Sequence, residues 1–123
     1  MKIFRILLSA ALIFILSACS AGGYNEETCK QLSEKANSGE TLSENDYNQM
    51  VDQTLAITKE LQTKANELKG EKYQEYMNSE ETKKMAAYAF SFGIYLEMNK
   101  SKLPESTLKK IEETQKEMKK LKN

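Results

Sequence analysis

Three adjacent pairs of glutamates are the clusters of acidic side chains that could perform acid–base catalysis or hold a metal ion. They are Glu26-Glu27, Glu80-Glu81 and Glu112-Glu113. Neighbouring residues of a helix point about 100° apart, so the two carboxylates of a pair do not readily share a metal ion or a substrate. We interpret these pairs as charge on helix surfaces.

The 123-residue chain contains no histidine. This excludes the usual zinc sites, the Ser/His/Asp and Cys/His hydrolase arrangements, and the most common general base near neutral pH. The sequence also lacks a phosphate-binding glycine loop, a calcium-loop pattern, a paired CxxC motif and a GxSxG motif. We therefore expect a protein that is not an enzyme and that needs no metal.

The first 18 residues have the pattern of a secretory signal peptide. Lys2 and Arg5 carry positive charge, and residues 6–16 are apolar apart from Ser9. This apolar stretch is about half of the roughly 20 residues that a helix needs to cross a bilayer, and charge flanks it on the N-terminal side only. The pattern predicts a segment that directs export and is then removed.

The end of this leader, Leu16-Ser17-Ala18-Cys19, resembles the lipobox of bacterial lipoproteins, which has an aliphatic residue, two small residues and a cysteine. The resemblance implies that the thiol of Cys19 becomes a diacylglyceryl thioether and that residues 1–18 are removed. Cys19 would then be the lipidated first residue of the mature chain, with this covalent lipid in place of any cofactor. Two or three acyl chains hold a protein at a membrane where one chain does not.

The residue after the lipobox bears on the destination. This residue is Ser20. In the enterobacterial sorting pattern, a residue other than aspartate at this position implies the outer membrane. We expect a domain outside the cytoplasm that is anchored to the cell membrane or to the outer membrane, and the sequence leaves both membranes open. The alternative is ordinary secretory cleavage after Ala21, with Cys19 unmodified.

Charge is balanced over the whole chain and uneven along it. The 18 basic side chains equal the 18 acidic ones, so the chain lacks the basic excess of a nucleic-acid binder, and we expect no nucleic-acid partner. Without the leader the net charge is near −2, with −7 over residues 19–81 and +5 over residues 82–123. We interpret the basic part as a solvated helix whose lysines alternate with glutamates. A face for anionic lipid or for a partner is the alternative.

Cys29 is the thiol that remains when Cys19 is alkylated, so a disulfide within the mature chain is excluded. It lies three residues before Leu32, on the same face of a predicted helix. We interpret it as a small buried apolar residue, because cysteine is often buried. The alternatives are a reactive thiol and a bridge to another chain.

Residues 26–123 predict an all-α domain, a small three- or four-helix up-and-down bundle, behind a flexible tether over residues 19–25. No segment alternates with period two, and no hairpin turn appears. Ser43 and Asp46 have the spacing of a capping box. The predicted helices cover residues 26–37, 43–69, 71–78, 79–98 and 104–123.

Residues 85–98 are apolar except at Ser91, Gly93 and Glu97. A helix that is apolar on nearly every side is expected to be buried on nearly every side, so the pattern predicts the central helix of the bundle. Gly93 costs roughly 1 kcal/mol relative to alanine, which indicates the close approach of another backbone.

The last predicted helix carries only a thin apolar stripe, which contains Leu108, Ile111 and Met118. A helix with so little apolar surface needs a partner surface. We predict that these three residues either close the bundle or bind another protein of the envelope. The expected function is a non-enzymatic interaction module. The alternative is an inhibitor, or a carrier in which the aromatic-rich helix over residues 85–98 lines a cavity for an apolar ligand.

Overall fold

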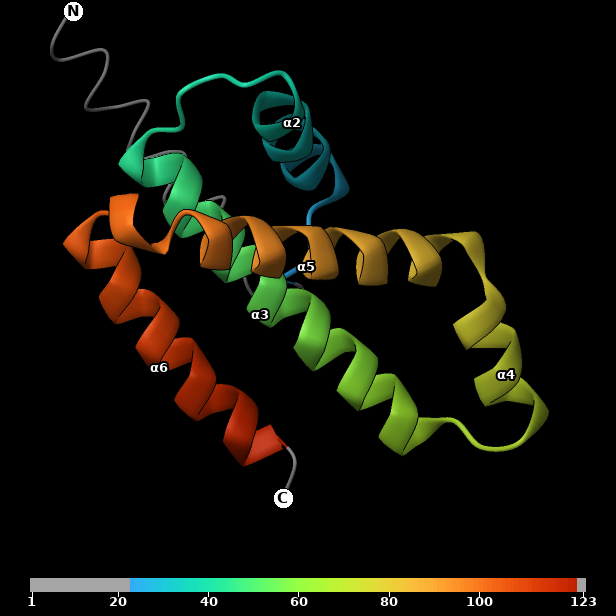
Figure 1. Cartoon of the computed structure of the whole chain (residues 1–123). Coiled ribbons are helices and arrows are strands. Elements are labelled where there is room, and N and C mark those ends of the chain that lie inside the picture. The colour runs from blue at the N-terminus through green and yellow to red at the C-terminus, as the bar shows by residue number, and fades with distance from the viewer. Residues whose placement is uncertain (1–22, 122–123) are drawn as a thin grey trace, which may run out of the picture.

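The computed structural model describes residues 23–121, which form five α-helices and one 3-10 helix (Figure 1). No strand occurs within these residues, and the predicted all-α helical bundle is confirmed. The predicted signal peptide and Cys19 lie outside the described residues. The elements are α2 (Glu26–Asn37), α3 (Glu44–Glu67), α4 (Glu71–Asn78), α5 (Glu80–Met98), η1 (Lys100–Lys102) and α6 (Glu105–Leu121).

Helix α3 packs against three of the other helices, α2, α5 and α6. Helix α5 crosses α3 obliquely, and α6 packs along another side of α3 (Figure 1). Helix α2 contacts both α3 and α5, whereas the short α4 contacts α5. The long amphipathic stripe of α3 therefore supplies the common surface of the bundle.

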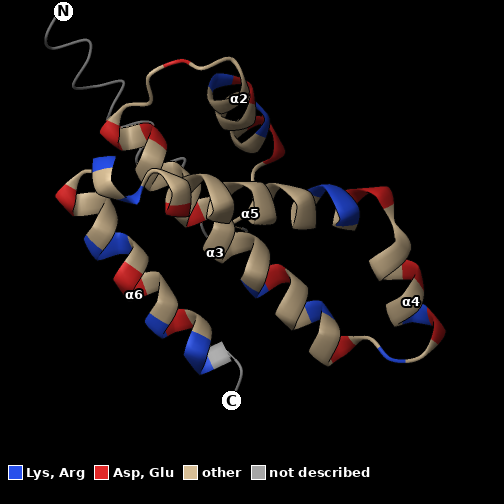
Figure 2. Cartoon of the chain, viewed as in Figure 1, with Lys and Arg blue, Asp and Glu red and all other residues tan. Residues whose placement is uncertain are grey.

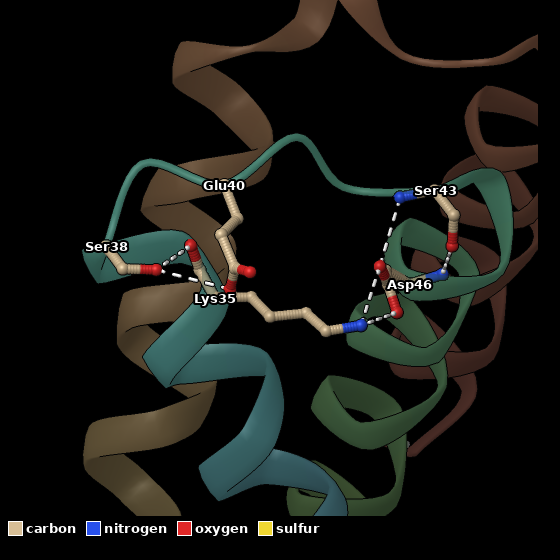
Figure 3. A network of polar contacts seen from close by, with 5 residues as sticks. All are labelled: Lys35, Ser38, Glu40, Ser43 and Asp46. Carbon is tan, nitrogen blue, oxygen red and sulfur yellow. Dashed lines mark hydrogen bonds and ion pairs between the residues drawn. The ribbon is translucent and has the colours of Figure 1, made fainter.

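A polar network fixes the start of α3 and joins it to α2 (Figure 3). The Ser43 hydroxyl accepts a hydrogen bond from the Asp46 N–H at 3.1 Å, and the Asp46 carboxylate accepts one from the Ser43 N–H at 3.0 Å. The predicted capping box is confirmed. Lys35 donates to both oxygens of Asp46 at 3.3 Å. Ser38 closes the end of α2, since its hydroxyl donates to the Lys35 carbonyl at 3.1 Å and to Glu40 at 3.3 Å.

The apolar core lies between α2, α3 and α5. Its largest side chain, Phe92, stacks on Tyr88 with 5.9 Å between the ring centroids. Cys29 is completely buried, as the sequence predicted. The buried apolar residues are Cys29, Leu32, Leu42, Met50, Val51, Ile57, Met85, Phe92, Leu96 and Leu103.

Helix α5 is not buried on nearly every side, so this prediction was wrong. Phe90, Ile94 and Met98 are 71%, 45% and 79% exposed. The buried residues of α5 are Thr82, Met85, Phe92 and Leu96, whose spacing places them on one stripe of the helix, so its neighbours cover one side of it. The prediction for Gly93 was also wrong, because no atom lies within 4 Å of where its Cβ would be.

Residues 23–25, which the sequence placed in a flexible tether, are docked on the bundle. The Gln53 side chain of α3 holds them: its Nε2 donates to the Gly23 carbonyl at 3.0 Å, and its Oε1 accepts from the Asn25 N–H at 2.8 Å. Gly23 lies so close to α3 that a Cβ there would fall 2.9 Å from the Cβ of Ala56. The tether prediction was wrong for these residues, and residues 19–22 lie outside the described part.

Candidate binding groove

Polar contacts along one side of α6 hold this helix on α3. The Thr107 hydroxyl is completely buried and donates to Asn48 Oδ1 at 2.7 Å. Three residues further along, Lys110 donates to Asp52 at 2.8 Å. Thr114, two turns after Thr107 on the same face, is also buried. The surface by which α6 packs on α3 is thus partly made of threonine and lysine side chains, which hydropathy alone does not indicate.

The charged residues of α6 lie at its surface, where blue and red alternate along the helix (Figure 2). Within α6, Lys116 lies 3.8 Å from Glu112, and Lys120 lies 3.7 Å from Glu117. This pattern fits the solvated basic helix that the sequence predicted. Exposed pairs of this kind contribute little to stability, typically about 0 to 1 kcal/mol.

A groove of about 450 Å³ opens between α5 and α6, with α3 as its floor. Figure 1 shows these two helices diverging from the turn at η1. The apolar lining comes from three helices: Val51 of α3, Leu96 of α5, and Leu108, Ile111 and Met118 of α6. The groove is therefore assembled from segments that are far apart in the sequence.

The three residues that the sequence singled out in α6 meet in this groove. Leu108 is 38% exposed, while Ile111 and Met118 are half-buried. Ile111 packs against the apolar core and so helps to close the bundle, and all three predicted residues line the groove. Thr107 is fully buried, whereas Thr114 is 7% exposed and also lines the groove.

The rim of the groove carries charge. Glu97 near the end of α5, Lys100 of η1, and Glu112 and Gln115 of α6 line the groove together with its apolar residues. An apolar centre inside a polar rim is typical of surfaces that bind other proteins. The arrangement can bind an apolar side chain or an apolar ligand and offers hydrogen bonds around it.

Sequence reasoning missed Val51 and Leu96 as members of this site. Both belong to apolar stripes that were recognised as helix faces, but the face of one helix does not show which other helix it meets. In the alternative carrier role, the aromatic residues of α5 were expected to line a ligand cavity. The α5 residues that line this groove are instead Gly93, Leu96 and Glu97, with Lys100 of η1 beside them.

The nucleophile candidate of the described chain, Cys29, is held in an unreactive form. Burial, and then the nearby negative charge of Glu26, raise the pKa of its thiol from 9.0 to about 12. The thiol also donates a hydrogen bond to Gln53 Oε1 at 3.3 Å. A neutral, inaccessible thiol is a poor nucleophile, so the buried structural role is the one observed.

Among residues 23–121, no three potential metal ligands gather into a group. In the same range, no helix is both long enough and apolar enough to span a bilayer. Comparison with known proteins found no family, no curated protein and no solved structure that matches the chain. The groove and the leader sequence are the features of the chain that indicate a function.

Proposed function

We propose that the chain is a small lipid-anchored protein of the bacterial cell envelope, and that its bundle binds another envelope protein through the groove between α5 and α6. The binding part of this proposal rests on one observation. Leu108, Ile111 and Met118 of α6 meet Val51 and Leu96 in a groove that is open to solvent. Apolar residues in such a position lose water when a partner covers them, which favours binding.

The anchoring part is supported by the resemblance of Leu16-Ser17-Ala18-Cys19 to a lipobox. Because Gly23 is docked on α3, the distance between the bundle and a lipid on Cys19 would be limited. From Cys19 to Gly23 the chain can extend about 14 Å at most. A lipid on Cys19 would keep the bundle close to the membrane surface, so its partner would be a protein at or in the same membrane.

The proposed role is non-enzymatic and uses no cofactor other than the lipid on Cys19. Two observations support this. The Cys29 thiol is buried and protonated, and Glu26 of the first glutamate pair forms an exposed ion pair with Lys84 at 3.0 Å. Neither group is placed for nucleophilic or acid–base chemistry.

The size of the groove favours a second candidate, a carrier of an apolar ligand. Its volume of about 450 Å³ lies in the range of small-molecule sites, which is roughly 300 to 1,000 Å³. Native mass spectrometry of the detergent-extracted chain separates the two candidates. A bound small molecule would support the carrier, whereas a bound polypeptide would support the interaction module.

A photocrosslinking experiment tests the interaction module directly. A photoreactive amino acid is placed at Leu108 in the full chain, and cells that naturally carry the protein are irradiated. The matched control places it at Lys109, which is exposed on the outer face of the same helix. We expect a crosslink to one envelope protein from position 108 and a much weaker one from position 109.

The crosslink should also respond to the shape of the groove. Met118→Asp puts a charge into the groove lining and should reduce crosslinking from position 108 if the partner occupies the groove. Equal crosslinking from positions 108 and 109, or none from either, would show that the groove is not the binding site.

A further inference from the structure

A second apolar surface runs along the exposed side of α5, and Gly93 at its edge also lines the groove. Phe90, Ile94 and Met98 are exposed there, as are the small residues Ala86, Ala87 and Gly93. We call these six residues the α5 stripe. Figure 2 shows the middle of α5 without charge along this length. An exposed apolar stripe this long marks an interaction site more often than a free surface.

We propose that the α5 stripe pairs two copies of this chain, with the two α5 helices antiparallel and a twofold axis at Phe90. In that register each residue meets the residue equally far from Phe90 on the other side of the axis. Lys83 of one copy then faces Glu97 of the other, and the same contact forms twice.

Charge complementarity supports this register. Lys83 and Glu97 are each seven residues from Phe90, and seven residues fall only about 20° short of two full helical turns. Both side chains therefore lie on the same face as the stripe, and both are exposed. Neither forms an ion pair within residues 23–121. Two opposite charges at the two ends of one apolar stripe match a twofold partner.

Shape complementarity supports the same register. Ile94 of one copy faces Ala86 of the other, and Gly93 faces Ala87. The two Phe90 rings meet on the axis, and the small residues on either side of them let the two helices approach closely. Within one chain a Cβ at Gly93 would meet nothing within 4 Å, so packing inside the bundle does not explain the glycine. The approach of a second α5 does.

Charge also argues against a membrane surface as the occupant of the α5 stripe. An anionic bilayer would favour basic flanks on both ends of the stripe, and Glu97 opposes this. The part of α5 from Lys83 to Glu97 is about 21 Å long, so the contact between the two copies is a small interface. Small interfaces form reversible complexes. The pairing itself does not depend on the proposed lipid anchor, although an anchor shared by both copies would strengthen it.

A disulfide at the predicted contact tests both the pairing and its register. The full chain with Lys83→Cys and Glu97→Cys is expressed in bacterial cells, and the whole cell lysate is oxidised gently with copper phenanthroline. The two new cysteines of one chain lie about 21 Å apart on α5, so they cannot join to each other. We expect a reducible dimer from the double variant, and little from either single variant or from the unmodified chain.

Substitution of Phe90 provides the matched comparison. Phe90→Asp in the double-cysteine chain should reduce the dimer about tenfold or more, because it puts two charges at the centre of the contact. Ala65→Asp, at another exposed helical position, should leave the dimer unchanged. No dimer from the double variant, equal dimer from the single variants, or a crosslink to a protein of another mass would overturn the proposal.

Discussion

Two phenylalanines of α5 show how much position decides the contribution of a residue. Phe92 is 2% exposed and stacks on Tyr88, whereas Phe90, two residues earlier, is 71% exposed. A helix turns through about 200° over two residues, so the two rings lie on nearly opposite faces. The same side chain therefore belongs to the core at one position and to the α5 stripe at the other.

We expect Phe92→Ala to cost about 3 to 5 kcal/mol of unfolding free energy, because it removes a large buried side chain and leaves a cavity. Phe90→Ala should change the unfolding free energy of the monomer by less than about 0.5 kcal/mol. Urea titration of both variants at low protein concentration measures the two values. Similar losses for the two variants would contradict the burial described here.

The burial of Cys29 predicts that its thiol resists alkylation. Burial and the charge of Glu26 raise the pKa of the thiol to about 12, so it stays protonated at pH 8. Mass spectrometry after treatment with iodoacetamide should show Cys29 unmodified in the folded chain and fully alkylated in urea. Rapid alkylation of the folded chain would mean that the contact with Gln53 is open in solution.

The Asp46 carboxyl predicts a loss of stability in acid. Burial acts to raise its pKa, but hydrogen bonds from Ser43 and Lys35 outweigh it and hold the pKa below the ordinary value of 3.8. An acid whose pKa is lowered by folding stabilises the folded state above its unfolded pKa, and this contribution disappears as the pH falls through the folded pKa. The chain should therefore lose stability below about pH 4.

Comparison with Asp46→Ala tests this contribution. At pH 7 the substitution should lower the unfolding free energy by about 1 kcal/mol, because it removes half of a capping box. Thermal unfolding at several pH values should show the difference shrinking as the pH falls below 4. A difference that does not depend on pH would contradict the ionised, hydrogen-bonded carboxylate.

At the scale of the elements, α4 is the helix with the weakest attachment. It contains no buried residue, and Gly70 at its start supplies no side-chain cap. Helix α3, by contrast, buries Met50, Val51 and Ile57 against its neighbours. Helices gain most of their stability in a protein from packing, so α4 depends on a small contact with α5.

We expect α4 to exchange its amide hydrogens faster than the other helices of the described chain, since local opening there breaks few contacts. The centre of α3, near Met50, should exchange most slowly. Hydrogen exchange followed by mass spectrometry resolves the two segments. If α4 is as protected as the centre of α3, a contact beyond those described must hold it.

The sequence predicted the helices well because their signals are local. Ser43 and Asp46 lie three residues apart and cap α3 whatever surrounds them, so the start of this helix could be placed within one residue. The apolar groove residues Leu108, Ile111 and Met118 were also found, because they form a periodic pattern within one segment.

The failures concern contacts between segments. The burial of α5 depends on how many helices cover it, and the amino-acid composition of α5 does not indicate that number. The docking of residues 23–25 depends on Gln53, a buried amide almost 30 positions along the chain. Polar residues that bury themselves by hydrogen bonding to distant backbone leave no pattern in hydropathy, so neither result could be read from the sequence alone.

At the scale of the whole molecule, the two proposed binding surfaces share helix α5. The groove lies between α5 and α6, and the α5 stripe lies on the outer side of α5. Gly93 and Glu97 belong to the edge of the groove and also lie on the face of the stripe. A partner in the groove and a second copy on the stripe would therefore be neighbours, and the proposed lipid on Cys19 would hold both close to the membrane.

The central claim is that a lipid on Cys19 holds this bundle at a membrane, and acyl labelling tests it most directly. Cells expressing the full chain are fed an alkyne-tagged fatty acid, and the purified protein is examined for the tag. We predict label on the unmodified chain and on the matched control Cys29→Ala, and none on Cys19→Ser. The labelled chains should fractionate with membranes. An unmodified chain without label, or a Cys19→Ser chain that keeps it, would contradict the account.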